Sequence, residues 1–428
     1  MSTRTGFEEL QARGFVSQVT NETAIRELFT KPPVSFYVGF DPTATSMHIG
    51  NMVPICAMAH LQRCGNRPVI LVGGATGMIG DPSGRTSERV LLTLDKVAEN
   101  LASIRTQFER FFSFEGPNAA IIVNNYDWTS KFSYIDWLRD VGKNFTINYM
   151  LQKKSVKMRL DDREQGLSYT EFSYMLLQAY DFLHLYDHEK CQLQCGADDQ
   201  WGNITAGTDL IRRMRGVEAY GITFPLLLTS EGEKLGKSTG GGSVWLDPKQ
   251  TSPYHFYQYW IQVPDADVGR MMKMFTFLSV EEIDEIVAEH LAAPEKRYGQ
   301  IRLATEVTRT VHGEEGLQKA QLATDVLFGK PIAGLNDDDL AGIFADVPAF
   351  TLARSRLDEG LSIIDLAVEA GAYPSKGEAR RAITSGGCYL NNHRVSDVAK
   401  KVTSEDLIAT ATMILRTGKK NYFLIRVK

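Results

Sequence analysis

Short apolar segments alternate with longer amphipathic segments throughout the first half of the chain. Five apolar segments have the length and composition of buried strands: 34–40, 68–73, 119–124, 190–194 and 224–228. Helical patterns such as 52–63 and 95–112 lie between them. Because strands that alternate with helices form parallel sheets covered on both faces, the pattern predicts an α/β domain with a doubly wound parallel sheet.

The predicted secondary structure changes twice in the second half of the chain. Helical patterns dominate 253–330 and predict an all-helical domain, whereas the stretch 331–358 is typical of a linker. The last 70 residues combine two predicted helices, 362–371 and 376–385, with short strands, which indicates a small α+β domain. We therefore expect three domains, at residues 1–245, 246–345 and 359–428.

The charge of the chain is unevenly distributed. Residues 374–428 contain eleven Lys and Arg against four Asp and Glu, a net charge of +7, which leaves -12 for the rest of a chain whose net charge is -5. A basic module attached to an acidic body favours a polyanionic partner such as a nucleic acid. A solvated lysine-rich surface is the alternative.

Neither a targeting segment nor a membrane span is predicted. The N-terminal segment carries acidic residues early, and the chain has no apolar run near 18 residues, so we expect a cytoplasmic protein without a membrane partner. The five cysteines are odd in number and scattered, which favours reduced thiols over a disulfide framework. Cys191 and Cys195 follow His184 and His188, but without a second spaced pair we predict no metal site.

The segment after the first predicted strand has the features of a phosphate site. It reads GFDPTATSMHIGN (39–51) and opens into a predicted helix, whose N-terminus presents free backbone N–H groups to an anion. His48 can donate a hydrogen bond to a phosphate oxygen, and Gly50 lacks the side chain that would keep a flat base away from the backbone. The motif His-x-Gly alone is weakly specific.

A second glycine cluster, GGATGMIGDPSG (73–84), follows the next predicted strand. It has neither the spacing of a dinucleotide fingerprint nor the ending of a P-loop, so we interpret it as a tight loop at the end of a strand. Arg85 and Arg89 come directly after it, and two guanidinium groups beside this site are suited to hold phosphates. Ordinary surface arginines would give the same pattern.

A third segment, TSEGEKLGKSTGGGS (229–243), follows the last predicted strand. Lys234 and Lys237 lie among glycines and small residues. Two cations on a flexible segment favour a mobile loop that closes over a triphosphate. A solvated hairpin turn is the alternative.

These segments together resemble the signatures of class I aminoacyl-tRNA synthetases. His48-Ile49-Gly50-Asn51 is similar to the HIGH signature, and Lys234-Leu235-Gly236-Lys237-Ser238 is similar to the KMSKS signature, in the same order along the chain. The resemblance implies a Rossmann-like catalytic domain that binds ATP through His48, Gly50, Lys234, Lys237 and Ser238. Asn51 departs from the family's second histidine, but its amide can still donate a hydrogen bond to a ribose or phosphate oxygen.

One predicted helix carries a polar stripe among apolar residues. It follows a capping-box pattern, Ser168-x-x-Glu171, and runs to about residue 187. Tyr174, Gln178 and Asp181 fall on one face at helical spacing, whereas the other faces are apolar. Because an unpaired buried polar group costs about 1 to 3 kcal/mol, either other side chains or a ligand must satisfy this stripe.

Four further runs narrow the resemblance to the bacterial-type tyrosyl-tRNA synthetases: YVGFDPTA, GGATGMIGDPSG, YMLLQAYDF and DDQWGN. The similarity extends over essentially the whole chain. It implies that Tyr37 and Asp181 hold the hydroxyl of tyrosine. It further implies contacts to the substrate ammonium group from Asp41, Asp81, Tyr174 and Gln178, a ribose contact from Asp199, and a place beside the reacting carboxylate for Gln200. The stretch 196–199, Gly-Ala-Asp-Asp, departs from the commoner Gly-Gly-Ser-Asp of the family.

The implied reaction needs alignment and charge stabilisation more than a base. The tyrosine carboxylate is already a nucleophile and attacks the α-phosphate of ATP. The resemblance assigns His48 and Thr43 to the phosphates, and assigns four cations to the departing pyrophosphate: Lys234, Lys237, Arg85 and Arg89. Mg²⁺ is expected to accompany ATP without a dedicated protein site.

The basic tail fits the second substrate of such an enzyme, tRNA(Tyr). Lys376, Arg380 and Arg381 lie on or beside one predicted helix, in a segment that resembles a small RNA-binding fold first known from a ribosomal protein. Lys419, Lys420 and Tyr422 are expected to add phosphate and stacking contacts. The resemblance also implies anticodon recognition by the helical domain, and a homodimer.

Two alternatives remain open. A tryptophanyl-type relative shares the signatures and the sheet, but not the basic tail or the pairing of Tyr37 with Asp181. A former synthetase retained as an RNA-binding scaffold would be favoured by loss of His48, Lys234 or Lys237, and all three are present.

Overall fold

The computed structural model describes residues 4–83, 92–153, 156–157, 160, 166–226, 228, 242–330, 332, 334–344, 347–418 and 421–428. The chain divides into two compact units, one of Met1–Asp247 with Tyr259–Val311 and one of Pro248–Gln258 with His312–Lys428. No helix among the described residues is both long enough and apolar enough to cross a lipid bilayer.

The first unit is built on a six-stranded sheet in the described residues, with strand order β1-β6-β5-β2-β3-β4. Every pairing is parallel except that of β1 with β6. The strands are β1 (Gln18–Val19), β2 (Ser35–Phe40), β3 (Arg67–Val72), β4 (Ile121–Asn124), β5 (Leu193–Ala197) and β6 (Tyr220–Phe224). The prediction of a doubly wound parallel sheet is therefore confirmed.

Two predicted strands are displaced along the chain. The segment predicted at 224–228 is β6, which ends at Phe224 because Pro225 has no amide hydrogen to continue the ladder. The segment predicted at 190–194 is β5, which begins at Leu193. Lys190 has a left-handed conformation (φ 56°) that ends the preceding helix, so the chain turns before the strand starts.

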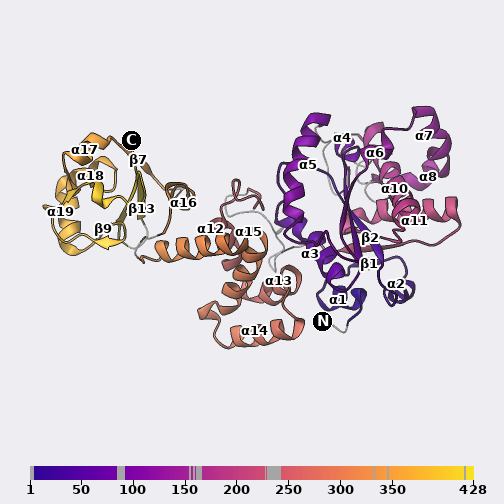
Figure 1. The fold of residues 1–428 in the computed structure, drawn as a ribbon, viewed down its shortest axis with the longest axis horizontal. Helices are drawn as coiled ribbons and strands as arrows, with labels where there is room; N and C mark the ends of the chain where they lie inside the picture. Colours follow the sequence, from indigo (N-terminus) through magenta and orange to yellow (C-terminus); the bar gives the residue numbers. More distant parts are fainter. Residues whose placement is uncertain are drawn as a thin grey trace. The chain divides into compact units, whose positions relative to one another are not determined.

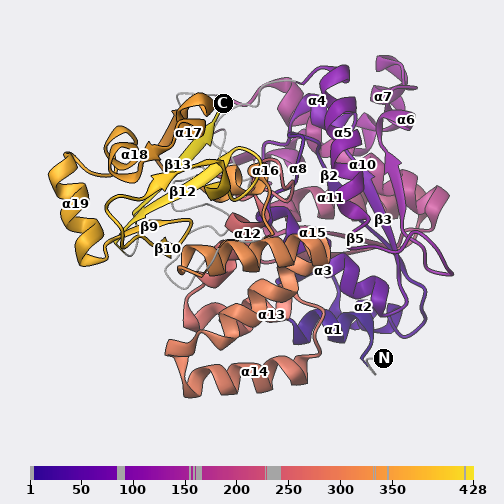
Figure 2. The ribbon, with the colours of Figure 1, turned by 60° about the vertical axis from the view of Figure 1, so that its left-hand side comes forward.

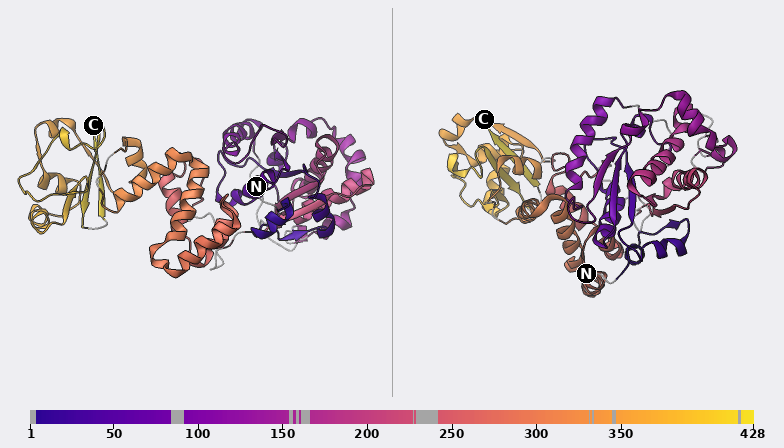
Figure 3. Two further views of the ribbon diagram at one scale, coloured as in Figure 1. Left: turned by 60° about the horizontal axis from the view of Figure 1, so that its bottom comes forward. Right: turned by 45° about the vertical axis from the view of Figure 1, so that its right-hand side comes forward.

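Helices cover both faces of this sheet (Figure 1). Phe40 of β2 contacts Phe108 of α5 (Leu94–Phe108), whereas Tyr37 of the same strand contacts Phe182 of α10 (Tyr169–Glu189) on the opposite face. Figure 3 shows the same layered arrangement from two further sides. Other helices of this part are α1 (Gly6–Ala12), α2 (Glu22–Leu28), α3 (Ile49–Arg63), α4 (Thr76–Ile79), α6 (Tyr126–Thr129), α7 (Tyr134–Asp140), α8 (Ile147–Leu151) and α11 (Trp201–Arg215).

Helix α10 forms where the sequence predicts it. The side chain of Ser168 accepts a hydrogen bond from the backbone N–H of Glu171 (3.2 Å), which satisfies a free donor of the first turn. The helix packs its apolar faces into a core with β2, β3 and α11. This packing directs the polar stripe of α10 toward the carboxyl ends of the strands.

The helical region predicted for 253–330 is also found. It comprises α12 (Pro253–Ile261), α13 (Val268–Phe275), α14 (Val280–Ala292) and α15 (Tyr298–Leu327). Helix α15 is interrupted at Gly313, whose backbone (φ 73°, ψ -177°) is not helical, so its two halves are separate helical segments. The boundary between the two units falls beside this interruption.

The second unit contains a sheet with strand order β10-β9-β12-β13-β7 in the described residues. Helices α18 (Ile363–Glu369) and α19 (Lys376–Ser385) pack on one face of this sheet, and α16 (Asp337–Ile343) packs on the other (Figure 2). The strands are β7 (Ala349–Leu352), β9 (Cys388–Leu390), β10 (His393–Arg394), β12 (Thr412–Thr417) and β13 (Asn421–Val427). A separate pair is formed by β8 (Leu361–Ser362) and β11 (Lys401–Val402), and α17 (Arg354–Asp358) precedes it.

The prediction of a linker at 331–358 is wrong for most of that stretch, which contains α16, β7 and α17. Strand β7 pairs in parallel with β13 and so belongs to the sheet of the small domain. Asp337 at the start of α16 accepts hydrogen bonds from the backbone N–H groups of Thr410 and Ala411, each at 3.1 Å. These contacts join residues more than 70 positions apart, and local composition does not reveal them.

Candidate active site

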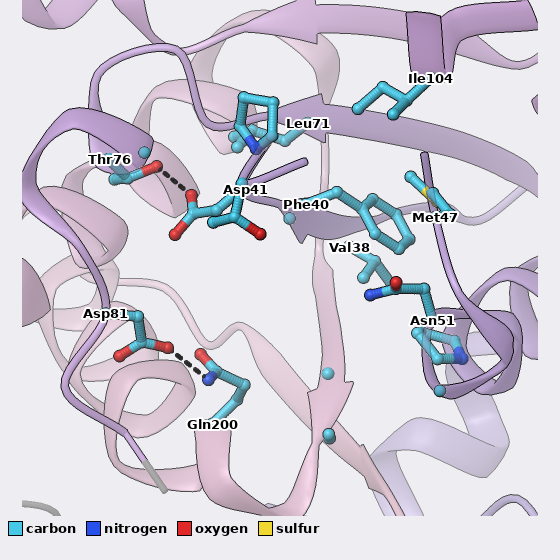
Figure 4. A pocket seen from close by; sticks show the side chains of 18 of the residues that line it. Val38, Phe40, Asp41, Met47, Asn51, Leu71, Thr76, Asp81, Ile104 and Gln200 are labelled. Atoms are coloured by element: carbon cyan, nitrogen blue, oxygen red, sulfur yellow. Dashed lines mark hydrogen bonds between the residues drawn. The ribbon is translucent and has the colours of Figure 1, made fainter. Parts of the chain in front are cut away.

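A cavity of about 760 Å³ opens at the carboxyl ends of β2 and β5, where doubly wound sheets bind ligands. Figure 4 shows part of its wall, with Asp81 and Gln200 on one side and Met47 and Asn51 on the other. The cavity brings together every predicted tyrosine or nucleotide residue that lies in the described part of the chain: Tyr37, Asp41, Thr43, His48, Gly50, Asn51, Asp81, Tyr174, Gln178, Asp181, Asp199 and Gln200. Arg85, Arg89, Lys234, Lys237 and Ser238 lie outside the described residues.

One end of the cavity is formed by Tyr37 and Asp181, each only 1% exposed. Burial raises the pKa of Asp181 to about 7, although two hydrogen bonds lower it: Asn125 Nδ2 (2.9 Å) and Trp128 Nε1 (2.8 Å) donate to its carboxylate. The Tyr37 hydroxyl is buried without a hydrogen-bond partner among the described residues. Burial also raises the pKa of Tyr37, so its hydroxyl stays protonated and can donate.

A phenol group fits this end of the cavity chemically. A hydroxyl that both accepts and donates can pair with the Tyr37 hydroxyl and with the Asp181 carboxylate at once. An apolar group at the same place would leave the buried Tyr37 hydroxyl unpaired, which costs about 1 to 3 kcal/mol. The polar pair therefore selects for a hydroxyl group.

Two further carboxylates face the cavity nearer to the ends of the strands. Asp41 accepts hydrogen bonds from Thr76 Oγ1 (2.7 Å) and from the Tyr174 hydroxyl (3.0 Å). Asp81 accepts one from Gln200 Nε2 (2.6 Å), and Figure 4 shows these carboxylates directed into the same space. Thr76, Tyr174 and Gln200 are neutral donors, so these three bonds orient the carboxylates without adding a positive charge. The arrangement suits a cationic group such as an ammonium.

The polar stripe of α10 thus lines the cavity along its length. Tyr174 and Asp181 are bonded as described, and Gln178 accepts a hydrogen bond from Asn203 Nδ2 (3.0 Å). Side chains of other elements therefore form hydrogen bonds with all three residues of the stripe. The same three residues also line the space that a ligand would occupy.

Asn125, Trp128 and Thr76 are residues of this site that sequence reasoning missed. Asn125 donates to Asp181 and to Thr76 Oγ1 (3.0 Å), and it accepts from the backbone N–H of Ala75 (2.7 Å). One signal was available, because Asn125 directly follows the predicted strand 119–124, at the edge where parallel strands carry ligand-binding residues. The role of Trp128 has no comparable signal in the sequence.

The nucleotide end of the cavity lies at the start of α3. His48 occupies the N-cap position, and its backbone N–H donates to Asn51 Oδ1 (3.1 Å). This bond uses the oxygen of the Asn51 amide, so the amide nitrogen is the group left to donate to a ligand. Burial lowers the pKa of His48, which keeps the imidazole neutral near pH 7.

The departure at residues 196–199 is accommodated by contacts outside the cavity. Asp198 accepts hydrogen bonds from Ser17 Oγ (2.8 Å), Gln18 Nε2 (3.2 Å) and Thr223 Oγ1 (2.6 Å). Its carboxylate is thereby held against β1 and β6, whereas Ala197 and Asp199 on either side line the cavity. Burial and the neighbouring Asp81 raise the pKa of Asp199.

The cysteine and histidine pairs form no metal site among the described residues. His184 stacks on Trp128 with ring centroids 4.2 Å apart, and His188 lies 4.2 Å from His184. Cys191 and Cys195 are buried thiols, and burial raises the pKa of both. Cys191 therefore belongs to the core and Cys195 to the wall of the cavity, whereas His184 packs on Trp128 and His188 is exposed.

The basic tail presents its predicted helix to solvent. Arg380 and Arg381 on α19 are exposed, and Lys376 pairs with Asp365 (2.7 Å). Lys419 and Lys420 lie outside the described residues. The prediction of a stacking contact from Tyr422 is wrong, because Tyr422 is 6% exposed and its hydroxyl donates to the backbone carbonyl of Leu327 (3.0 Å).

Comparison with known proteins places this geometry among synthetases. The family model of class I tRNA synthetases (W and Y) matches residues 30–329, and the model of the tyrosine–tRNA ligase SYY-like C-terminal domain matches residues 339–425. A tyrosine–tRNA ligase of Rhodopirellula baltica is 49% identical over 428 residues, with 100% of this chain and 97% of that relative covered. One of Roseiflexus castenholzii is 49% identical, with 98% and 99% covered.

Solved structures show the same likeness. A C-terminally truncated mitochondrial tyrosyl-tRNA synthetase of Aspergillus nidulans is 31% identical with a TM-score of 0.68, over 76% of this chain and 94% of that one. A tyrosyl-tRNA synthetase of Archaeoglobus fulgidus in complex with L-tyrosine is 17% identical with a TM-score of 0.54, over 74% of this chain and 99% of that one. The second similarity is one of fold alone.

Proposed function

Because the chain belongs to the class I tRNA synthetases of the tryptophan and tyrosine family, we propose that its cavity activates L-tyrosine with ATP and transfers the tyrosyl group to tRNA(Tyr). The first product is tyrosyl-adenylate, and the acceptor is the 3′-terminal adenosine. Tyrosine, ATP and tRNA are thus the three substrates of the enzyme.

One observation carries the choice of tyrosine, namely the buried polar end made by Tyr37 and Asp181. A phenol hydroxyl would satisfy both groups, and phenylalanine would satisfy neither. Tryptophan would bring a single N–H donor to a place that offers both a donor and an acceptor. The end of the cavity therefore favours tyrosine over both of these amino acids.

The ammonium group of tyrosine is assigned to the two oriented carboxylates. Asp41 and Asp81 supply the negative charge, and Tyr174 and Gln178 supply neutral hydrogen-bonding groups beside them. An ammonium bound here and a hydroxyl bound at Asp181 place the carboxylate of the substrate toward the nucleotide end. Gln200, which bonds Asp81, then lies beside the reacting carboxylate, and Asp199 contacts the ribose.

The proposed chemistry is an in-line displacement at phosphorus. A carboxylate oxygen of tyrosine forms a bond to the α-phosphorus of ATP, the bond from that phosphorus to the bridging oxygen breaks, and pyrophosphate leaves. The carboxylate is already anionic, so no base is needed, and catalysis consists of alignment and charge stabilisation. The groups assigned to the phosphates are His48, Thr43, Lys234, Lys237, Arg85 and Arg89, and Mg²⁺ enters bound to the phosphate oxygens of ATP.

The second step forms an ester. The terminal ribose hydroxyl of tRNA attacks the carbonyl carbon of tyrosyl-adenylate, and AMP and a proton are released. Phosphate contacts to the tRNA are assigned to five cations of the tail: Lys376, Arg380, Arg381, Lys419 and Lys420. In this proposal residues 1–245 catalyse, residues 246–345 recognise the anticodon, and residues 359–428 bind RNA, all in the cytoplasm.

A homodimer is part of the proposal, and one apolar surface of the first unit supports it. Tyr134 and Ile135 of α7, Ile147 of α8 and Tyr169 of α10 are each more than half exposed. The side chains of Tyr134 and Tyr169 lie close enough to interact, so α7 and the start of α10 share this surface. Exposed apolar clusters of this kind are typical of interfaces, and a two-fold dimer would bury the same cluster of both copies.

Exchange of labelled pyrophosphate into ATP tests the proposal directly. The purified full-length chain is assayed with each amino acid in turn and with MgATP. Exchange that depends on tyrosine alone, followed by tyrosyl transfer to tRNA(Tyr), is the expected result. Exchange that depends on tryptophan would refute the substrate, and no exchange with any amino acid would favour an RNA-binding scaffold.

A further inference from the structure

The imidazole of His48 lies against Gly50. A methyl group added at Gly50 would stand 2.8 Å from Cε1 and 3.0 Å from Nδ1 of His48, which is closer than carbon atoms normally approach. This glycine is therefore required by the position of the histidine ring, in addition to any approach of a base. With its Cε1–Nδ1 edge against Gly50, the ring has Nε2 as the nitrogen left to reach a ligand.

A second element contacts the same ring. The backbone of Trp245 forms an antiparallel bridge with His48. Two hydrogen bonds flank the bridge: the N–H of Ile49 donates to the carbonyl of Val244 (3.0 Å), and the N–H of Leu246 donates to the carbonyl of Met47 (2.8 Å). The bridge therefore fixes the register of residues 244–246 against the start of α3.

The register decides where the indole of Trp245 points. Val244 and Leu246 are each 3% exposed, so their side chains face the core. Side chains alternate along an extended segment, so Trp245 must project to the opposite side, and it lines the cavity there. Its ring meets that of His48 edge-on, with centroids 5.9 Å apart and planes at 63°.

We propose that Trp245 is a positioning residue for adenylate formation: its indole and Gly50 both contact the His48 imidazole and restrict its orientation, so that Nε2 faces the phosphates of ATP. The proposal rests on the function proposed above. An imidazole attached through two rotatable bonds samples several orientations, and a donor that is oriented in advance stabilises the transition state more than a free one. The aromatic contact therefore contributes to kcat through His48, without requiring Trp245 to touch the substrate.

The test uses the full-length protein in pyrophosphate exchange with tyrosine and MgATP. Trp245→Leu keeps an apolar side chain but removes the aromatic edge, and we expect kcat to fall about tenfold, a fraction of what loss of a whole transition-state donor costs. The KM for tyrosine is expected to change less than about twofold, because the contact does not reach the amino-acid end. Trp245→Phe restores the edge and is expected to recover most of kcat.

A double-mutant cycle separates action through His48 from direct action. In the His48→Ala background, Trp245→Leu is expected to cause no further loss of kcat, because the ring that it positions is gone. An equal fold-loss in both backgrounds would overturn the proposal and make Trp245 a direct nucleotide contact. Unchanged kcat for Trp245→Leu in the natural background would overturn it as well.

Leu246→Ala is the matched control on the same strand. It removes buried contacts at the residue that directly follows Trp245 and is expected to lower the melting temperature while kcat of the folded enzyme is retained. A loss of kcat equal to that of Trp245→Leu would assign the effect to the strand and refute the role of the ring. Inactivity of the unmodified protein would refute the proposed function instead, so the two failures are distinguishable.

Discussion

The buried carboxyl of Asp181 lowers the stability of the ligand-free protein near neutral pH, and Asp181→Asn should remove this destabilisation. Burial raises the pKa of this carboxyl from 3.8 to about 7. Below pH 4 the carboxyl is protonated in both the folded and the unfolded chain, so it has no effect on stability. Between pH 4 and pH 7 the unfolded chain releases the proton and the folded chain keeps it, so the free energy of unfolding decreases as pH rises.

The size of the effect follows from the displacement of the pKa. A shift of about three pH units corresponds to roughly 4 kcal/mol, reached in full above pH 7. An asparagine does not titrate, but its NH₂ group would face one of the donors from Asn125 and Trp128, which costs about 1 to 3 kcal/mol at every pH. We therefore expect Asp181→Asn to be more stable than the unmodified protein by about 1 to 3 kcal/mol at pH 8.

The pH dependence is the sharper measurement. Denaturant unfolding of the ligand-free protein is followed at several values between pH 5 and pH 8, and the difference between variant and unmodified protein should grow by about 3 kcal/mol over this range. Asp187→Asn on the same helix is the matched control. Arg215 holds the pKa of Asp187 below its usual value, so both its folded and unfolded forms are ionised above pH 5 and its difference should stay constant.

A difference for Asp181→Asn that does not vary between pH 5 and pH 8 would refute the reasoning. It would mean that Asp181 is ionised throughout this range, and hence that Asn125 and Trp128 outweigh burial. The same variant should lose discrimination in favour of tyrosine at every pH. A gain in stability combined with a loss of selectivity would show that Asp181 destabilises the fold but is needed to bind the ligand.

Three further predictions concern the same enzyme. Tyr37→Phe should lower the ratio of kcat/KM for tyrosine over phenylalanine about five- to tenfold, the value of one hydrogen bond, in pyrophosphate exchange; an unchanged ratio would contradict the assignment of the phenol end. Trp128→Phe removes a donor to Asp181 and should raise by about one unit the pH below which kcat/KM for tyrosine falls; a pH profile that does not move would show that this bond does not control the carboxyl. Ile135→Asp places a charge in the proposed dimer surface and should convert the protein from dimer to monomer in light scattering, whereas an unmodified protein that is already monomeric would refute that surface.

The fold was predictable because its main signals are local. Short apolar segments separated by amphipathic ones specify a parallel sheet regardless of which strands pair, and the capping pattern at Ser168 specifies the start of a helix wherever that helix packs. The stretch 331–358 was misread because β7 is stabilised by β13, far along the chain, and a short strand of that kind has no pattern of its own. Tyr422 was misread for the same reason, since its ring packs on Phe344 and its hydroxyl bonds to the backbone of Leu327, both far from it along the chain.

Positions at the ends of strands were predictable, but their partners were not. Asp41 directly follows the predicted strand 34–40, so a sheet rule agrees with the resemblance in placing it at the cavity. Asp199 lies five residues after the predicted strand 190–194 but two after β5, so only the resemblance indicated it. Trp128 reaches Asp181 only because α6 and α10 lie beside each other behind β4, and no spacing in the sequence encodes that contact. The hydrogen bonds that tune the carboxyl are therefore a property of the tertiary fold.

The two ends of the amino-acid pocket are joined by one chain of hydrogen bonds. Asp41 accepts from Tyr174 and Thr76, Thr76 accepts from Asn125, and Asn125 also donates to Asp181. Every donor in this chain of hydrogen bonds is neutral, so these bonds fix the separation of the two carboxyl groups without adding a positive charge. One of these carboxylates faces an ammonium and the other a phenol in the proposed complex. In the proposed complex a ligand is consequently selected by the distance between its ammonium and hydroxyl groups as well as by their chemistry. This distance is set in part by Asn125, which belongs to the network but does not line the cavity.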